Sequence, residues 1–332
     1  LWDVAAETPL ARIDDIRPKL VRVTPDRTRF LVAQLRSGST NAAADSTVDV
    51  VVHAASSGDV LTRIGDGLPL QGIVGGGTSP TRHPTDRTAG ISPDGTHVLC
   101  TTETRVYVLR LDTGEPVAHF EEERPQATLR PHTSEVFFVR GHDFGDELSV
   151  PVYDWDAGQE VYRLPNPSDR IQSFVQATVT ATFDPNGQIL VTTPTEMGSN
   201  WTVPVLWKPS SSGSSPFTIQ SVLPLQRGDI TPVRFGRSGR SVLIASHRDP
   251  TVHVYHAASD RPGVRGEEHL SLAGHEDGVM LAEWVPGSPH VLTRSTTGRL
   301  RLWPTFSSTE ALIDSARATL TRDLSGPMLE NL

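Results

Sequence analysis

Residues 91–117 have the sequence ISPDGTHVLCTTETRVYVLRLDTGEPV, and this stretch contains one complete unit of a pattern that runs through the chain. An apolar run ends in Pro-Asp-Gly, a second apolar run follows, and a third contains Val108-Leu109. Proline presets the first angle of a tight turn and glycine accepts a positive φ, so the first two runs predict a β-hairpin. The third run predicts another strand beside that hairpin.

The third run recurs along the chain, and each copy has a Trp, a Tyr or an apolar substitute at one place, which we call the Trp position. The residues at the Trp position are Trp2, Val52, Leu109, Tyr153, Trp207, Tyr255 and Trp303. Neighbouring copies lie between 44 residues (Leu109 to Tyr153) and 57 residues (Val52 to Leu109) apart. Recurrence at about this period is typical of a propeller built from four-stranded blades. The sequence therefore predicts an all-β propeller.

Every copy except the first follows a predicted hairpin. The six hairpins begin at Val21, Ile91, Leu129, Phe183, Phe235 and Trp284. We therefore favour seven blades, of which the first is truncated, and we expect its missing hairpin just upstream of Leu1. A ring of six blades, with residues 9–13 closing the last blade, is the alternative. Residues 1–304 form the propeller domain in either case.

After Trp303 the spacing of apolar residues becomes that of a helix. Ser307 and Glu310 form a capping-box pattern. The apolar residues at helical spacing are Leu312, Ala316 and Leu320. This pattern predicts one helix near residues 308–322, inside a helical tail that comprises residues 305–332.

The charge and cysteine content exclude several classes of function. Lys and Arg number 30 against 39 Asp and Glu, which gives a formal net charge of −9. This balance argues against nucleic acid or an anionic membrane as the main partner. Cys100 is the only cysteine, so an internal disulfide and a multi-cysteine zinc site are both impossible, and a cytoplasmic location is favoured. No apolar run approaches the roughly 20 residues of a membrane span.

Residues 272–303 resemble a WD40 repeat, because Gly274-His275 opens the segment and Trp303 ends its third strand. The resemblance covers residues 1–304 as a whole. It implies that His275, Ser295 and Trp303 form a hydrogen-bonded set inside the last blade. This set lacks its aspartate, since that slot falls on Thr296 or Thr297. The resemblance also implies structural roles for Gly274, Trp207 and Trp2.

The C-terminal tail resembles the helical tail that follows the last repeat of large bacterial WD40 proteins. Those proteins carry an upstream signalling NTPase of the NACHT or STAND type, a caspase-like peptidase or a protein kinase. The resemblance implies a sensor or scaffold module that controls such an effector.

The sequence contains no recognisable motif for catalysis or for cofactor binding. The 12 histidines are scattered, and no metal-binding spacing emerges. The run Gly75-Gly76-Gly77 is followed by neither a lysine nor a predicted helix, so a phosphate-binding loop is excluded. We predict no enzymatic activity, no cofactor and no metal. Trp155 and Trp201 lie off the Trp position, and they either pack between blades or contact a partner.

Three turn-rich insertions, at residues 37–46, 65–87 and 209–216, predict long loops. We expect them to bind a protein or peptide on one rim of the ring, with a partner surface that is neutral or basic. The leading hypothesis is a non-catalytic binding module of a larger bacterial signalling protein, in contact with that protein's upstream domains. The alternative is an enzymatic, hydrolase-like propeller with a site in its central channel. The sequence leaves the oligomeric state open.

Overall fold

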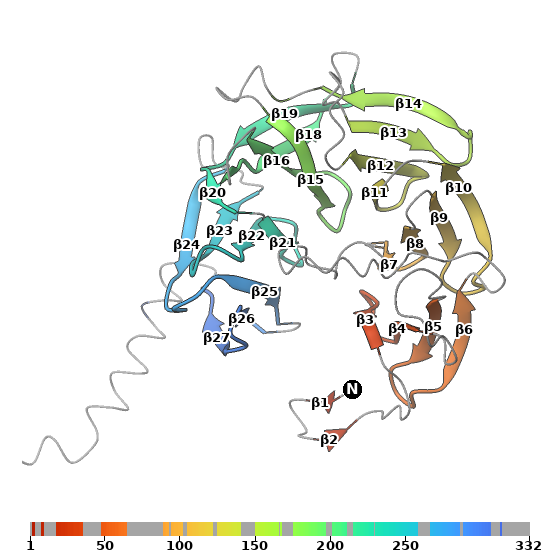
Figure 1. Cartoon of the computed structure of the whole chain (residues 1–332), viewed down its shortest axis with the longest axis horizontal. Coiled ribbons are helices and arrows are strands. Elements are labelled where there is room, and N and C mark those ends of the chain that lie inside the picture. The colour runs from red at the N-terminus through yellow and green to blue at the C-terminus, as the bar shows by residue number, and fades with distance from the viewer. Residues whose placement is uncertain are drawn as a thin grey trace, which may run out of the picture.

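The fold is an all-β propeller of small antiparallel sheets, as the sequence predicts (Figure 1). The computed structural model describes residues 2–3, 8–9, 18–35, 48–64, 89–92, 94–101, 105–121, 125–140, 150–165, 167, 175–196, 201–210, 215–228, 230–257, 266–285, 288–306 and 313.

Six sheets follow one another along the chain, and we number them sheet 1 to sheet 6. Sheet 1 contains β3 (Pro18–Val23), β4 (Arg29–Leu35), β5 (Val48–Ala54) and β6 (Val60–Ile64). Sheet 2 contains β7 (Ala89–Ile91), β8 (His97–Thr101), β9 (Arg105–Arg110) and β10 (Pro116–Glu121). Sheet 3 contains β11 (Pro125–Leu129), β12 (Glu135–Arg140), β13 (Val150–Asp154) and β14 (Gln159–Leu164).

The remaining three sheets differ in their number of strands. Sheet 4 contains β15 (Val175–Phe183), β16 (Leu190–Glu196), β18 (Val205–Pro209) and β19 (Phe217–Val222), with β17 (Trp201–Thr202) and β20 (Gln226–Arg227) added. Sheet 5 contains β21 (Ile230–Phe235), β22 (Ser241–Ser246), β23 (Val252–His256) and β24 (Glu268–Leu272). Sheet 6 contains β25 (Val279–Trp284), β26 (His290–Ser295) and β27 (Leu300–Pro304). A separate hairpin contains β1 (Trp2–Asp3) and β2 (Thr8–Pro9).

The predicted repeat units correspond to these strands. All seven residues at the Trp position lie in strands, and each one after Trp2 follows a two-stranded hairpin. The two N-terminal strands pair with each other, and no pairing of β2 with β27 is seen among the described residues. Closure of the last sheet by residues 9–13 is a prediction that falls, apart from Pro9, outside the described residues. The predicted C-terminal helix lies outside the described residues except for Ile313, which is helical.

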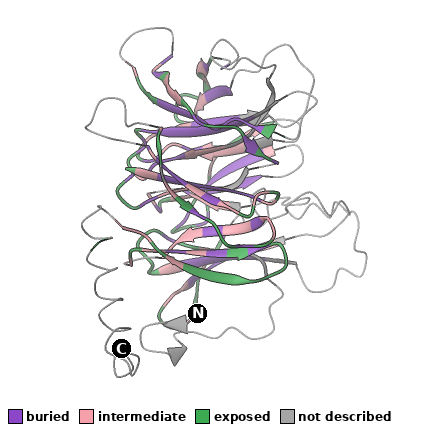
Figure 2. Ribbon diagram, turned by 90° about the vertical axis from the view of Figure 1, so that its left-hand side faces the viewer, coloured by how far each residue is buried: buried purple, intermediate pink, exposed green. Residues whose placement is uncertain are grey.

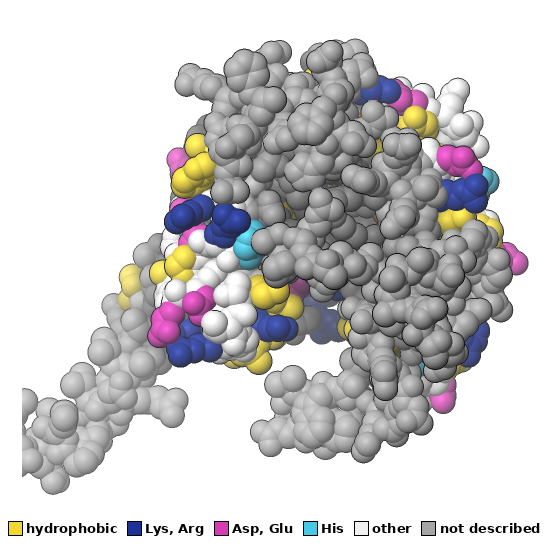
Figure 3. Space-filling view, in the orientation of Figure 1, with side chains coloured by type: hydrophobic (Ala, Val, Ile, Leu, Met, Phe, Trp, Pro, Cys, Tyr) yellow, Lys and Arg dark blue, Asp and Glu magenta, His cyan; other side chains and the backbone are white. Residues whose placement is uncertain are grey.

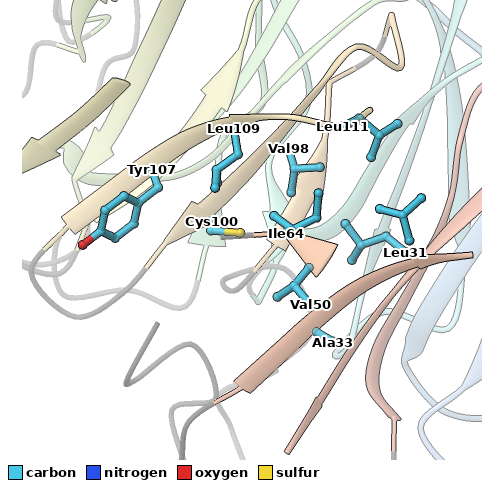
Figure 4. Close-up of a cluster of buried hydrophobic side chains, with 10 residues drawn as sticks. Leu31, Ala33, Val50, Ile64, Val98, Cys100, Tyr107, Leu109 and Leu111 are labelled. Atoms are coloured by element: carbon cyan, nitrogen blue, oxygen red, sulfur yellow. The ribbon is translucent and has the colours of Figure 1, made fainter. Parts of the chain in front are cut away.

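Successive sheets pack face to face around the ring (Figure 1). The buried side chains form five clusters, one between each pair of neighbouring sheets from sheet 1 to sheet 6. Figure 4 shows the first cluster, in which Leu31 and Val50 of sheet 1 meet Val98 and Cys100 of sheet 2. Because a sheet inside the ring is covered on both faces, its central strands are apolar at successive positions rather than at alternate ones.

The tight turns between first and second strands also contact one another from sheet to sheet. The backbone N–H of His132 in sheet 3 donates to Asp94 Oδ2 in sheet 2, at 3.1 Å. Gly187 has a φ of +67°, and a Cβ there would lie 3.0 Å from the Pro131 carbonyl oxygen of the preceding sheet. Position 187 therefore requires glycine for two reasons. Its φ is positive, and a side chain there would crowd Pro131 of the neighbouring sheet. Among the described residues, no helix has the length and hydropathy needed to cross a membrane.

Candidate functional site

The strand order gives the ring two ends with different connections. The turn end carries the turns between first and second strands and between third and fourth strands. The loop end carries the connections between second and third strands and the links between sheets. Residues 36–47 join β4 to β5 and residues 65–88 join β6 to β7, so both connections start and finish at the loop end.

The expectation that all three predicted long loops share one rim is wrong for residues 209–216. This segment joins β18 to β19, the third and fourth strands of sheet 4. In an antiparallel sheet such a connection lies at the same end as the turn between the first two strands. The segment therefore belongs to the turn end, opposite the other two insertions.

Sheet 4 carries an extra ladder of two short strands that the sequence analysis did not find. Strand β17 pairs with β16 through Thr202 and with β20 through Trp201 and Thr202. The hydroxyl of Thr202 donates to the Gly228 carbonyl at 2.9 Å. The amide of Gln226 donates to the Tyr255 hydroxyl of sheet 5 at 3.0 Å. Buried polar contacts of this kind hold the ladder in one position because each group has a partner.

The opposite face of this ladder is exposed and carries a tryptophan. Trp201 and Arg227 are directly paired, and Leu225 lies two residues before Arg227, so the three side chains share a face. Trp201 is 41% exposed and Leu225 is 51% exposed. The side chain of Arg248 packs against Gly228, the residue after Arg227, since a Cβ on Gly228 would lie 2.9 Å from the Arg248 Cγ. We call Trp201, Leu225, Arg227 and Arg248 the ledge, and Figure 3 shows basic and apolar side chains together over β20 and β23.

The residues predicted to form a hydrogen-bonded set in the last sheet come together with one substitution. The indole N–H of Trp303 donates to Thr293 Oγ1 at 2.7 Å, and His275 Nε2 lies 2.6 Å from the same oxygen. Gly274 permits the approach, because a Cβ there would lie 3.1 Å from the Trp303 ring. Burial, followed by the nearby Arg301 charge, lowers the pKa of His275 below its usual value.

The predicted role of Ser295 in this set is wrong. Its hydroxyl lies 2.9 Å from Thr297 Oγ1 and accepts a hydrogen bond from the Arg299 backbone. Strand pairing explains the difference, since Trp303 pairs with Val291 and Arg301 pairs with Thr293. Thr293 is therefore the hydroxyl next to the indole on its own face, whereas Ser295 belongs to the turn that follows.

The other predicted tryptophans have distinct environments. Trp207 is 1% exposed and donates from its indole nitrogen to Thr192 Oγ1 at 2.8 Å. Trp155 is half-buried and packs between sheets 2 and 3, with its ring centroid 5.2 Å from that of His97. Trp2 lies in β1, and its side chain is outside the described residues. Trp201 is thus the partner-contact candidate whose side chain is exposed.

Two described groups that could take part in catalysis, the Cys100 thiol and the His253 imidazole, have structural surroundings. Burial raises the pKa of the Cys100 thiol to about 12, which removes its nucleophilic form at neutral pH. His253 Nδ1 lies 2.9 Å from Glu268 Oε1, and its Nε2 faces the Asp249 carboxylate at 3.7 Å. A nucleophile–base pair needs a hydroxyl or thiol at the second ring nitrogen, and both ring nitrogens of His253 instead face carboxylates. Within the described ranges, no three His, Cys, Asp or Glu side chains are placed to hold a metal ion.

Neither a scan of protein-family models nor a search of curated proteins finds a match to this chain.

Proposed function

We propose that this chain is a non-catalytic protein- or peptide-binding module, a WD40-type propeller that controls an effector domain of a larger bacterial signalling protein in the cytoplasm. Propellers place loops and side chains on a rigid ring, and binding residues are disproportionately found in such positions. The partner is a protein or peptide, and the module uses no cofactor.

The observation that carries the proposal is the exposed face of the extra ladder in sheet 4. Trp201 is held by a backbone ladder whose other face is buried, so it is presented rigidly to solvent. Tryptophan and arginine are the residue types that dominate binding energy at protein interfaces. Because the strand that carries Trp201 is already fixed, less conformational entropy is lost when a partner binds.

The test selects binders from a displayed library of 12-residue peptides on the immobilised chain. Trp201→Ala is expected to weaken the selected peptides by about 30-fold, the loss typical of an interface hot spot. The control is Val161→Ala, because Val161 is also exposed, at 43%, but lies in β14 of sheet 3. Equal binding by the wild type and Trp201→Ala would contradict a binding role for the ledge.

The two ends of the ring provide a second test. Replacing residues 37–46 or 65–87 by a short Gly-Ser linker changes the loop end, where the ledge is found. The same replacement at residues 211–214 changes the turn end. We expect partner binding to fall only with the first two replacements. Turnover of a substrate by the purified chain, lost on substitution of a channel residue, would instead favour the enzymatic alternative.

A further inference from the structure

The ledge has a local charge opposite in sign to that of the whole chain. The chain has a formal net charge of −9, whereas the two charged side chains of the ledge, Arg227 and Arg248, are both cations. Both are exposed, and neither forms an ion pair with another described residue. The net charge favours a neutral or basic partner, but recognition at short range depends on the charges of the contact surface itself.

One buried hydroxyl holds the two arginines next to each other. Ser246 Oγ donates to the Arg227 carbonyl and accepts from the Arg248 backbone N–H at 3.2 Å. Ser246 is 1% exposed, so the side chain that makes this bridge is shielded from water. Gly228, the residue after Arg227, also packs on the Arg248 side chain. The two arginines therefore start from neighbouring points of sheets 4 and 5, close enough for both to contact one anion.

The acidic residue that follows Arg248 in the sequence is engaged with other groups. Asp249 Oδ1 accepts from the Thr251 backbone N–H at 2.8 Å, and its Oδ2 faces His253 Nε2 at 3.7 Å. The Nε–H of Arg248 donates to His247 Nε2 at 3.2 Å. Among the described residues, no acceptor meets the two terminal nitrogens of this guanidinium. They are the donors that an incoming carboxylate would use.

The apolar half of the ledge lies at a defined spacing from Arg227. Leu225 is two residues before Arg227, which corresponds to about 7 Å along an extended chain, and Trp201 is directly paired with Arg227. An extended peptide repeats this spacing, because its side chains two residues apart also share a face. Figure 2 views the ring from the side on which Figure 1 places β20, and it shows exposed segments at the surface of sheets whose inner segments are buried.

We propose that the ledge binds an acidic peptide in extended conformation, in which a large apolar side chain and a carboxylate lie two residues apart. The apolar side chain packs on Trp201 and Leu225, and the carboxylate accepts hydrogen bonds from Arg227 and Arg248. This inference rests on the proposed binding function and specifies its partner. A single-stranded nucleic acid also offers rings and anions, but each nucleotide would add a negative charge beside a chain whose net charge is −9. A peptide with one or two carboxylates is therefore the favoured occupant.

Three labelled octapeptides test the proposal by fluorescence anisotropy. The first contains Trp-Ser-Glu between Gly-Ser linkers, and the second has Gln in place of Glu. The third has the order Trp-Glu-Ser, which moves the carboxylate to the other face of an extended chain. We expect the first peptide to bind at least about tenfold more tightly than the other two, as hydrogen bonds to a charged group allow. Equal affinity of the first peptide and either of the others would overturn the proposal.

Substitution of the arginines assigns the carboxylate contact to the ledge. Arg227→Gln and Arg248→Gln should each lower the affinity for the Glu peptide about fivefold and leave the affinity for the Gln peptide unchanged. Each should shift the melting temperature by no more than about 1 °C, because the side chain is exposed. Arg237→Gln is the matched control, since Arg237 is also exposed but lies in the turn between β21 and β22, at the opposite end of the ring. A preference for Glu over Gln that survives both ledge substitutions would overturn the proposal.

The remaining outcomes separate this inference from the proposed function. Binding that requires Trp201 but is equal for the Glu and Gln peptides would overturn the acidic partner and leave a peptide-binding ledge. No binding of any of the three peptides at up to about 1 mM would also overturn the inference, whereas the library selection decides the proposed function separately. An oligothymidine that binds more tightly than the Glu peptide would overturn the proposal in favour of a nucleic-acid site.

Discussion

Trp207 and Trp303 occupy the same position in two sheets and make the same hydrogen bond, yet they differ in burial. Each indole N–H donates to a threonine hydroxyl two residues beyond its paired residue, at 2.8 Å for Trp207 and 2.7 Å for Trp303. Trp207 is 1% exposed, whereas Trp303 is half-buried. Trp303 is therefore less buried than Trp207, although the two tryptophans occupy the same position.

The difference between the two sheets shows which parts of the local structure depend on neighbours. The Trp–Thr hydrogen bond depends only on the register of two adjacent strands, and both sheets have that register. Burial depends on a fourth strand and on a neighbouring sheet at each face. Sheet 4 has β19, with Phe217 and Ile219, and sheets 3 and 5 at its two faces. Sheet 6 has only sheet 5 among the described residues.

The largest expected effect comes from truncating these two tryptophans. Trp207→Ala should lower the free energy of unfolding by about 3–5 kcal/mol, as for other buried aromatic residues. Trp303→Ala should cost roughly half as much, because its ring is already partly in water. Urea unfolding of the two variants measures the difference. Equal losses would show that sheet 6 is covered as fully as sheet 4.

A smaller effect is expected from the threonine hydroxyls. Thr192→Val leaves the buried indole N–H of Trp207 without an acceptor and should cost about 1–3 kcal/mol. Thr192→Ser is the control, because it keeps the hydroxyl that accepts the hydrogen bond from Trp207. A double-mutant cycle with Trp207→Phe isolates the interaction, and we expect a coupling energy larger than that between Thr293 and Trp303. A larger coupling at Thr293 would reverse the comparison.

Acid should weaken the first turns of sheets 1 and 2 and the contact between the turns of sheets 2 and 3. Burial opposes ionisation of Asp94, but hydrogen bonds from Ser92, Thr96 and the His132 backbone outweigh it and lower its pKa from 3.8 to about 2. Hydrogen bonds from the Thr24 and Thr28 hydroxyls lower the pKa of Asp26 to about 2 as well.

A carboxyl group whose pKa is lowered on folding stabilises the folded state above its unfolded pKa. The contribution of Asp94 is therefore complete above about pH 4 and is lost as the pH falls through about 2. Urea midpoints at pH 7, 4 and 2.5 should decrease in the wild type, and less steeply in Asp94→Asn. Parallel decreases in the two proteins would show that other groups cause the acid sensitivity.

The smallest expected effect on stability concerns Trp201, which lies in the same sheet as Trp207 but is 41% exposed. Trp201→Ala should change the free energy of unfolding by no more than about 0.5 kcal/mol, as exposed substitutions usually do. Thermal unfolding of the purified variant checks this. A loss comparable to that of Trp207→Ala would mean that Trp201 is part of the core and is unavailable to a partner.

The parts of the fold that could be predicted from sequence are those set by local patterns. The Pro-Asp-Gly turn before Val98 and the strand at Leu109 follow from turn chemistry and from apolar runs that recur along the chain. Strand order also predicts the end of the ring at which each loop emerges. For residues 209–216 this prediction requires knowing that the segment joins the third and fourth strands of its sheet.

The features that were missed depend on contacts between distant residues. The pairing of Trp201 with Arg227 involves two strands of two residues each, which are too short to show an apolar period. Thr293 replaces Ser295 beside Trp303 because the cross-strand register, rather than the spacing in sequence, determines which hydroxyl the indole meets. The exposure of Trp303 follows from the lack of a fourth strand beside β27 among the described residues, and its own sequence contains no signal of this.

Native-state hydrogen exchange of β18 and β27 tests most directly the claim that the ring is covered on both faces in sheet 4 and on one face in sheet 6. Amides of β27 that bond to β26, such as those of Arg301 and Trp303, should open at a lower free energy than the most protected amides of β18. We expect them to exchange about tenfold faster or more, because strands with fewer packed neighbours open locally. Equal protection of the two strands would contradict the account.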